Sequence, residues 1–162
     1  MIENGNYQKL RNYALRLLSI RPRSIEEIKG KLLWYSIKKG ISNKLVGSLI
    51  EELLSQNLIN DEEFAIWWIE QRRSFRPKGK RLIKLELLEK KVDREIIDKM
   101  LEKKEVGSSE FELGQKLVSK KASLFKNETA EVKKRKIANL LLRRGFDWGT
   151  ISKVIDSVFK KS

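Results

Sequence analysis

The residues most able to bind a charged partner form one basic run in the middle of the chain. No acidic residue lies between positions 72 and 84, and Gly79 stands just before the expected start of a helix. The basic residues of this run, termed the basic elbow, are Arg72, Arg73, Arg76, Lys78, Lys80, Arg81 and Lys84. Free backbone N–H groups at a helix start attract anions. We therefore expect the basic elbow to bind a partner, although a solvated helix surface would show the same run of charge.

A second group of basic residues lies near the C-terminus. It consists of Lys133, Lys134 and Lys136 within one expected helix, followed by Arg143 and Arg144 in the last turn of that helix. Cations in a last turn also complement the helix dipole, which accounts for part of this pattern without any partner. This C-terminal cluster is the next candidate for a binding surface.

Few kinds of catalysis are open to this sequence. It contains no His and no Cys, which excludes a Ser-His-Asp triad, His–zinc sites and thiolate chemistry. Phosphate-binding glycine motifs are absent as well. Asp61, Glu62 and Glu63 could form a metal-binding carboxylate cluster, but carboxylates at a helix start are explained by capping and by the helix dipole. We expect no enzyme activity, no metal and no cofactor.

The overall charge favours an anionic partner. The 162 residues carry a formal net charge of +14, which attracts nucleic acid, an anionic membrane or an acidic protein. No run approaches the ~18 apolar residues of a membrane span. The first residues show no apolar signal region, so we expect a cytoplasmic protein with no membrane partner.

Helical spacing of apolar residues runs through the whole chain. Signals for helix starts and ends divide the chain into separate helices. Ser24 with Glu27 indicates a capping box at a helix start, Pro22 and Pro77 indicate helix ends before them, and Gly40 indicates a helix C-terminus. In the helix that begins near Asn60, Phe64, Trp68 and Phe75 fall on one face, so we expect Trp68 to be buried. Trp67 lies at the margin of that face and could belong to the core or stack on a base. Arg72, one turn after Trp68, could stack on its indole ring.

One junction between helices recurs along the chain. An apolar residue, a capping residue and an apolar helical stripe follow one another at Ile41-Ser42, Val92-Asp93 and Phe146-Asp147, about 50 residues apart. The pattern predicts an all-α chain, a tandem array of three three-helix repeats that is elongated and curved. We place the repeats at residues 1–59, 60–106 and 107–162.

These motifs, in this order, resemble the bacterial regulatory protein RecX family. The second repeat matches best, with Asp61-Glu62, Phe64-Ala65, Trp68-Ile69 and Arg72 leading to the Gly79-Lys80-Arg81 entry of a Leu-rich helix. The first repeat offers Ser24, Glu27-Ile28 and Lys31-Leu32, and the third Arg143-Arg144-Gly145-Phe146. Lys91 departs from the pattern, because the family usually has Gly there, and this predicts a tighter or less bent junction.

The resemblance implies a non-enzymatic regulator of the RecA recombinase in homologous recombination, DNA repair and the SOS response. Such a protein would bind the RecA–single-stranded-DNA filament, contact single-stranded DNA, with double-stranded DNA as a further candidate partner, and act as a monomer. It would inhibit RecA ATPase, strand exchange and coprotease activity. Two alternatives remain open: a stand-alone DNA-binding helical protein, and a carboxylate-dependent nuclease.

Overall fold

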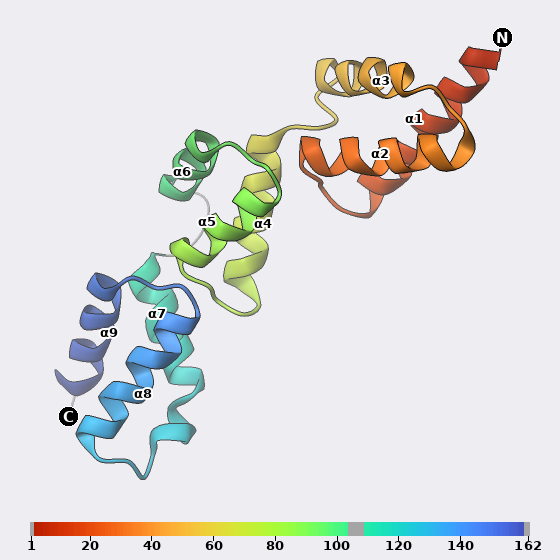
Figure 1. Cartoon of the computed structure of the whole chain (residues 1–162). Helices are drawn as coiled ribbons and strands as arrows, with labels where there is room; N and C mark the ends of the chain where they lie inside the picture. The colour runs from red at the N-terminus through yellow and green to blue at the C-terminus, as the bar shows by residue number, and fades with distance from the viewer. Residues whose placement is uncertain (1, 104–108, 161–162) are drawn as a thin grey trace. The chain divides into compact units, whose positions relative to one another are not determined.

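The computed structural model describes residues 2–103 and 109–160, and throughout that part the chain is helical, without a strand (Figure 1). The helices before the basic elbow are α1 (Ile2–Ile20), α2 (Ile25–Lys39), α3 (Asn43–Ser55) and α4 (Asp61–Ser74). Those after it are α5 (Lys80–Glu89), α6 (Arg94–Glu102), α7 (Glu110–Lys120), the 3-10 helix η2 (Ala122–Phe125), α8 (Ala130–Arg143) and α9 (Trp148–Lys160). The expected all-α fold is confirmed.

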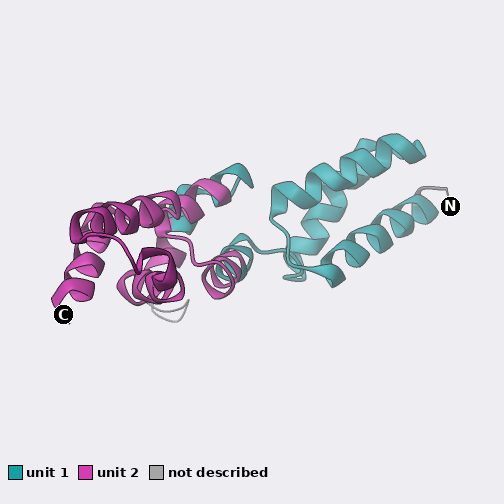
Figure 2. Cartoon of the chain, turned by 90° about the horizontal axis from the view of Figure 1, so that it is seen from below, with its two compact units in different colours: residues 1–67, 87–97 teal, residues 68–86, 98–162 magenta. Residues whose placement is uncertain are grey.

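Packing divides the chain into two compact units (Figure 2). Unit 1 takes residues 1–67 and 87–97, and unit 2 takes residues 68–86 and 98–162. The chain therefore changes unit within α4, α5 and α6. Repeat boundaries at 59/60 and 106/107 stay a prediction, since this division follows packing and not the repeat pattern.

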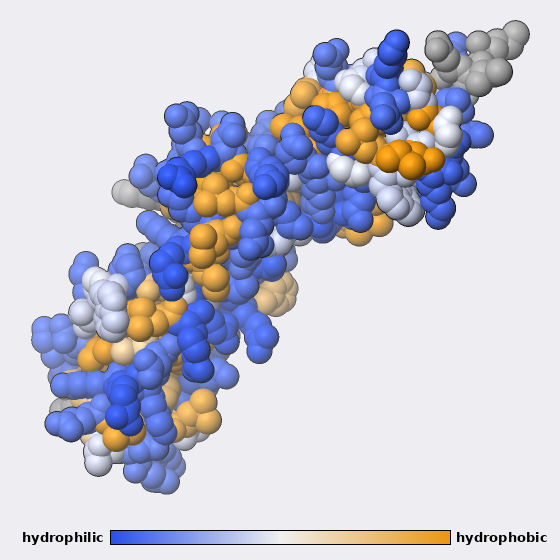
Figure 3. Space-filling view, viewed as in Figure 1, coloured by the Kyte–Doolittle hydropathy of each residue, from blue (hydrophilic) through white to orange (hydrophobic). Residues whose placement is uncertain are grey.

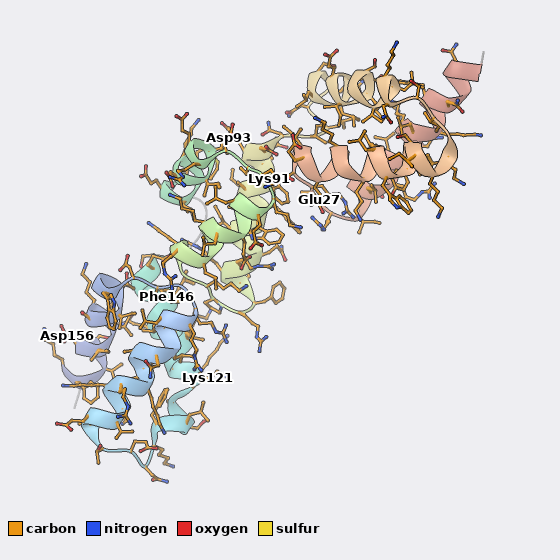
Figure 4. The ribbon with its side chains drawn as sticks, in the orientation of Figure 1. Glu27, Lys91, Asp93, Lys121, Phe146 and Asp156 are labelled. Carbon is orange, nitrogen blue, oxygen red and sulfur yellow. The ribbon has the colours of Figure 1, made fainter. Side chains whose placement is uncertain are left out.

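Each unit has its own apolar core. In unit 1 the core is built on α1, α2 and α3 and includes Leu10, Ala14, Ile28, Leu32, Val46, Leu49, Leu53 and Ile59. The main core of unit 2 is built on α7, η2, α8 and α9 and includes Leu113, Leu117, Phe125, Ile137, Leu141, Phe146, Ile151 and Val154. Phe146, in the turn between α8 and α9, is fully buried (Figure 4). In the described ranges no helix is long and apolar enough to cross a bilayer.

The recurring junction is real and has the same hydrogen bonds each time. The N–H groups of Ile41, Val92 and Phe146 donate to carbonyl oxygens five residues back, at 2.8, 3.2 and 3.0 Å. All three apolar residues are buried. Gly40 and Gly145 precede two of them in the left-handed backbone region, with φ of 66° and 89°. This pattern, a Schellman motif, satisfies the last carbonyls of each helix.

The junction at Val92, the second of the three along the chain, corrects one expectation about Lys91. Although it is not Gly, Lys91 has φ of 63°, almost the value of Gly40. Its N–H donates to Leu88 O at 3.0 Å. The turn between α5 and α6, marked by Lys91 and Asp93 in Figure 4, is therefore neither tighter nor less bent than the turn at Gly40.

The residues that cap the helix N-termini are largely those predicted from the sequence, but Glu27 and Asp61 bind other partners than expected. Ser24 Oγ accepts from Glu27 N–H at 3.1 Å, and Asn60 Oδ1 accepts from Glu62 N–H at 2.9 Å. Glu27 (Figure 4) does not complete a capping box; its carboxylate instead accepts from Arg21 and Arg23. Asp61 Oδ1 accepts from Ile25 N–H at 2.9 Å, so it caps α2 rather than its own helix. The bond to Ile25 explains Asp61 at the start of α4, and among the described residues no group of three or more Asp and Glu side chains could hold a metal ion.

The face of α4 was predicted wrongly in part. Phe64, Ala65 and Ile69 are buried, but Trp68 is only half-buried and Phe75 is 76% exposed. Phe75 lies outside the helix, because α4 ends at Ser74. Trp68 is polar at one edge, where its Nε1 donates to Glu86 Oε2 at 2.9 Å.

Candidate cationic binding surface

The basic elbow is an ordered turn between α4 and α5. Lys78 N–H donates to Arg72 O at 3.2 Å and closes the loop back onto the end of α4. Pro77 and Gly79 are buried, while Arg76 between them and the helix is exposed. The loop is thus fixed at its second half and presents its first half to solvent.

Glu86 of α5 binds three side chains of the elbow region. Its carboxylate accepts from Trp68 Nε1 at 2.9 Å, Arg72 Nε at 2.7 Å and Lys78 Nζ at 2.6 Å. Burial alone would raise the pKa of Glu86, but these hydrogen bonds outweigh burial and hold the pKa below its ordinary value. The Arg72 guanidinium also lies 4.1 Å from the centre of the Trp68 ring, as the alternative reading of Arg72 predicted.

Glu110 of α7 occupies the other side of the elbow. It accepts from Arg73 Nη2 at 2.8 Å and from Lys80 N–H at 3.1 Å. Burial raises the pKa of Glu110 in spite of these contacts, and burial likewise lowers the pKa of Arg73. A buried ion pair of this kind fixes geometry more clearly than it adds stability.

Two hydrogen bonds within the protein correct the expectation about free N–H groups at the start of α5. Gly79 N–H donates to Arg144 O, and Lys80 N–H donates to Glu110, so both groups already have partners. Neither of these two N–H groups is therefore free to bind an external anion. The basic elbow contains no acidic residue in sequence, but in the folded protein the carboxylates of Glu86 and Glu110 contact its cations.

The predicted binding residues fall into two sets. The first set is engaged within the protein: Arg72, Arg73 and Lys78 as above, Arg81 Nη2 donating to Leu142 O at 3.1 Å, Lys84 paired with Asp98 at 2.7 Å, Lys134 lying over the Phe159 ring at 5.1 Å, and Lys136 paired with Glu128. The second set is Arg76, Lys80, Lys133, Arg143 and Arg144, whose side chains make no ion pair within the described part of the chain. Of these, Arg76, Lys80 and Arg143 are exposed.

Close backbone contact joins the elbow to the end of α8. A Cβ atom on Gly79 would lie 2.3 Å from the carbonyl carbon and oxygen of Gly145, and one on Gly145 would lie 2.4 Å from Leu82 Cβ. Together with the Gly79–Arg144 and Arg81–Leu142 hydrogen bonds, this contact lies wholly within unit 2. It brings the basic elbow beside Arg143 and Arg144, two groups that sequence reasoning treated as separate. Both glycines are visible in the sequence, but nothing in their spacing shows that they meet.

The fold and this site define a class of protein: an all-α helical-repeat protein whose most evident functional feature is a surface of exposed cations. Hydrophilic side chains cover much of the face seen in Figure 3, with apolar patches among them. Such a surface suits recognition of an anionic partner.

Comparison with known proteins identifies the family. Residues 60–101 match the second three-helix domain of RecX, and residues 108–155 match the third. The regulatory protein RecX of Chlorobium limicola is 34% identical over 148 residues, which cover 91% of this chain and 88% of that protein. A regulatory protein RecX from Mycobacterium sp. (strain KMS) is 32% identical over 148 residues, 89% of this chain and 78% of that one. The chain belongs to the RecX family.

Solved structures agree with this assignment. A crystal structure of RecX from Lactobacillus salivarius superposes with a TM-score of 0.82 at 26% identity, covering 97% of this chain and 99% of that one. A second crystal structure, of a regulatory protein RecX, gives 0.73 at 21% identity and supports the fold alone. The all-α repeat architecture and a regulatory role therefore stand on sequence and structure together.

Proposed function

We propose that this protein regulates the RecA recombinase by binding the RecA–single-stranded-DNA filament and lowering its ATPase, strand-exchange and coprotease activity. Membership of a family of regulatory proteins supports the role. The partner and the mode of binding rest on the chemistry of the cationic surface. In this proposal the protein acts as a monomer, in the cytoplasm, in recombination and repair.

The observation that carries the proposal is the junction of two basic groups in unit 2. The Gly79–Gly145 contact joins the elbow to the end of α8, and this supports a shared surface that includes the exposed residues Arg76, Lys80 and Arg143. Phosphates neutralised by such cations release counterions, which supplies affinity without preference for a base sequence. A regulator that acts on filaments formed on any DNA needs binding of this kind.

The contacts also revise which residues would carry the binding. Arg72, Arg73 and Lys78 hold the elbow in shape through Glu86 and Glu110, so they act on a partner mainly by positioning the loop. Lys84 is paired with Asp98 and only partly available. Arg76, Lys80 and Arg143 remain as the cations best able to meet phosphates, with Lys133 and Arg144 beside them.

Inhibition would then follow from occupancy and not from catalysis. The chain has no His and no Cys, and at the start of α4 Asp61 caps α2 while Asn60 caps α4. We accordingly propose a non-enzymatic protein whose bound state obstructs the filament.

The test is sedimentation of the protein with RecA filaments assembled on single-stranded DNA, beside RecA alone and DNA alone. The proposal expects the largest bound fraction on the complete filament. A matched pair of variants locates the surface: Arg76→Glu with Arg143→Glu should release the protein, whereas Lys29→Glu with Lys44→Glu, two exposed lysines of unit 1, carries the same change in charge and should not. Equal binding to bare DNA and to the filament would favour the stand-alone DNA-binding alternative.

A further inference from the structure

Phe75 is the most exposed large apolar side chain described, with 76% of its surface open to solvent. It is the first residue after α4 and lies within the basic elbow. Single exposed apolar residues are common on protein surfaces, so exposure alone would mean little. The ordered loop that carries Phe75 and the basic residues beside it in sequence indicate a binding role for this side chain.

The loop that carries Phe75 is held at defined points. Lys78 N–H donates to Arg72 O at 3.2 Å, across the loop from one side of Phe75 to the other. Pro77 is buried and Gly79 packs against the backbone of Gly145. A side chain projecting from so constrained a loop loses little conformational freedom on binding.

The charged groups around Phe75 leave the nearest free side chains positive. Arg76 follows it directly and is exposed, and Lys80 is exposed at the start of α5. Glu86 is engaged by Arg72 and Lys78 and Glu110 by Arg73, while Lys80 also lies in the electrostatic field of the Glu110 and Asp147 carboxylates without forming an ion pair among the described residues. An exposed aromatic ring is thus followed directly by an exposed cation, Arg76, that forms no ion pair in the described ranges, with Lys80 at the end of the same loop.

We propose that Phe75 stacks on an unpaired base of single-stranded nucleic acid while Arg76 and Lys80 contact the adjoining phosphates; this rests on the proposed function and names the residue that senses single-strandedness. Aromatic rings set in a cationic groove are the general means of binding single strands, because every base has a π-face. In a duplex the base faces are stacked on one another, so Phe75 would have to separate them before it could stack.

An exposed Phe could instead enter a pocket on a protein partner. The centre of such an interface is usually an anchor surrounded by further contacts that exclude water. At Phe75 the neighbours in sequence are Ser74 and Arg76, one polar and one basic, and both are exposed. A nucleotide, which offers a ring and a phosphate together, matches this arrangement better.

The experiment compares two probes that differ only in bases: a thymidine oligonucleotide and an abasic deoxyribose-phosphate oligomer of the same length. The full chain and Phe75→Leu are titrated into each at several salt concentrations. Phe75→Leu should weaken binding to the thymidine oligonucleotide about tenfold and leave the abasic oligomer unchanged. The dependence on salt should be the same for both proteins, since no charge is lost.

Three further variants separate base stacking by Phe75 from other contributions to binding. Phe75→Trp keeps a π-face and should retain the affinity of the parent. Leu124→Ala removes an apolar side chain of unit 2 that is 63% exposed and should change neither titration. Arg76→Gln should weaken both probes alike and reduce the salt slope by about 1. Thermal melting should be unchanged in Phe75→Leu, because the side chain is exposed.

Several results would overturn the inference. The inference fails if the parent does not bind the free thymidine oligonucleotide. It also fails if Phe75→Leu binds both probes as the parent does, or loses affinity for both equally. Normal binding of Phe75→Leu to oligonucleotides together with weaker binding to RecA filaments would place Phe75 against protein. Sedimentation of the parent with RecA filaments tests the proposed function independently of all these results for Phe75.

Discussion

Lys91 holds a backbone conformation that usually belongs to glycine, at the junction between α5 and α6. Its φ of 63° lies in the left-handed region, where a Cβ atom crowds the neighbouring carbonyl oxygen. The other two junctions of the same kind have Gly40 and Gly145 in that place. The hydrogen bonds of the turn, together with buried Val92, hold Lys91 in its strained conformation.

Relief of this strain should stabilise the protein. Lys91→Gly should raise the free energy of unfolding by about 1 kcal/mol, as the gain in backbone freedom of the unfolded chain offsets part of the relief. Gly40→Ala is the matched control: nothing lies within 4 Å of the added Cβ, so its expected loss of about 1 kcal/mol comes from the left-handed backbone conformation and not from a steric clash. Urea unfolding followed by circular dichroism measures both. A destabilised Lys91→Gly variant would contradict the account of this turn.

Glu86 makes the stability of the folded protein depend on pH. Its pKa is lowered in the folded protein, so its contribution to stability is present above the ordinary pKa of a Glu side chain and is lost as pH falls through the lowered value. Glu86→Gln should therefore cost stability at neutral pH, and the difference from the parent should shrink as the solution is acidified. Thermal melting of both proteins across the acid range tests this. A difference that is constant, or that grows toward acid pH, would show that Glu86 does not carry this charge linkage.

At the scale of elements, the elbow depends on two glycines that let backbones meet. Gly79 lies against Gly145 so closely that an added Cβ would overlap the Gly145 carbonyl. The obstacle is backbone and cannot rotate away. The joined cationic surface of unit 2 therefore depends on the absence of a side chain at position 79.

Gly79→Ala should lower the free energy of unfolding by about 2–3 kcal/mol, because the backbones must separate. Gly30→Ala is the contrasting change: Gly30 lies within α2 with open space around it, and Ala should raise stability by about 0.5–1 kcal/mol. Denaturant midpoints of the two variants and the parent provide the comparison. A Gly79→Ala variant as stable as the parent would mean that the α5 start and the α8–α9 turn are not packed as described.

The helices and their ends could be read from the sequence because they depend on neighbours along the chain. Ser24, Ser42, Ser109 and Thr129 accept hydrogen bonds from N–H groups two or three residues on, and Gly40 ends α2 in the left-handed region. What sequence reasoning missed depends on residues far apart. Glu110 reaches Arg73 across 37 positions. Periodicity also placed Trp68 in the core, and could not show that Glu86 and Arg72 would satisfy it at a half-buried position.

For the whole molecule, the candidate site was predicted in outline and altered in detail. The basic elbow exists as an ordered turn, but internal partners engage most of its cations, and Phe75, Arg76, Lys80 and Arg81 are exposed. The division into repeats at residues 1–59, 60–106 and 107–162, the elongated and curved array, and the monomeric state stay predictions. The central claim is that a cationic surface of unit 2 brings this RecX-family protein onto the RecA filament.

The most direct test of that claim is RecA ATPase on single-stranded DNA, titrated with the parent, with Arg76→Glu/Arg143→Glu and with the matched Lys29→Glu/Lys44→Glu control. The account predicts equal inhibition by parent and control, while the Arg76→Glu/Arg143→Glu variant needs about tenfold more protein, a gap that narrows at higher salt. Equal inhibition by all three would move the site away from this surface. An ATPase that continues unchanged in the presence of the folded parent would contradict regulation of RecA itself.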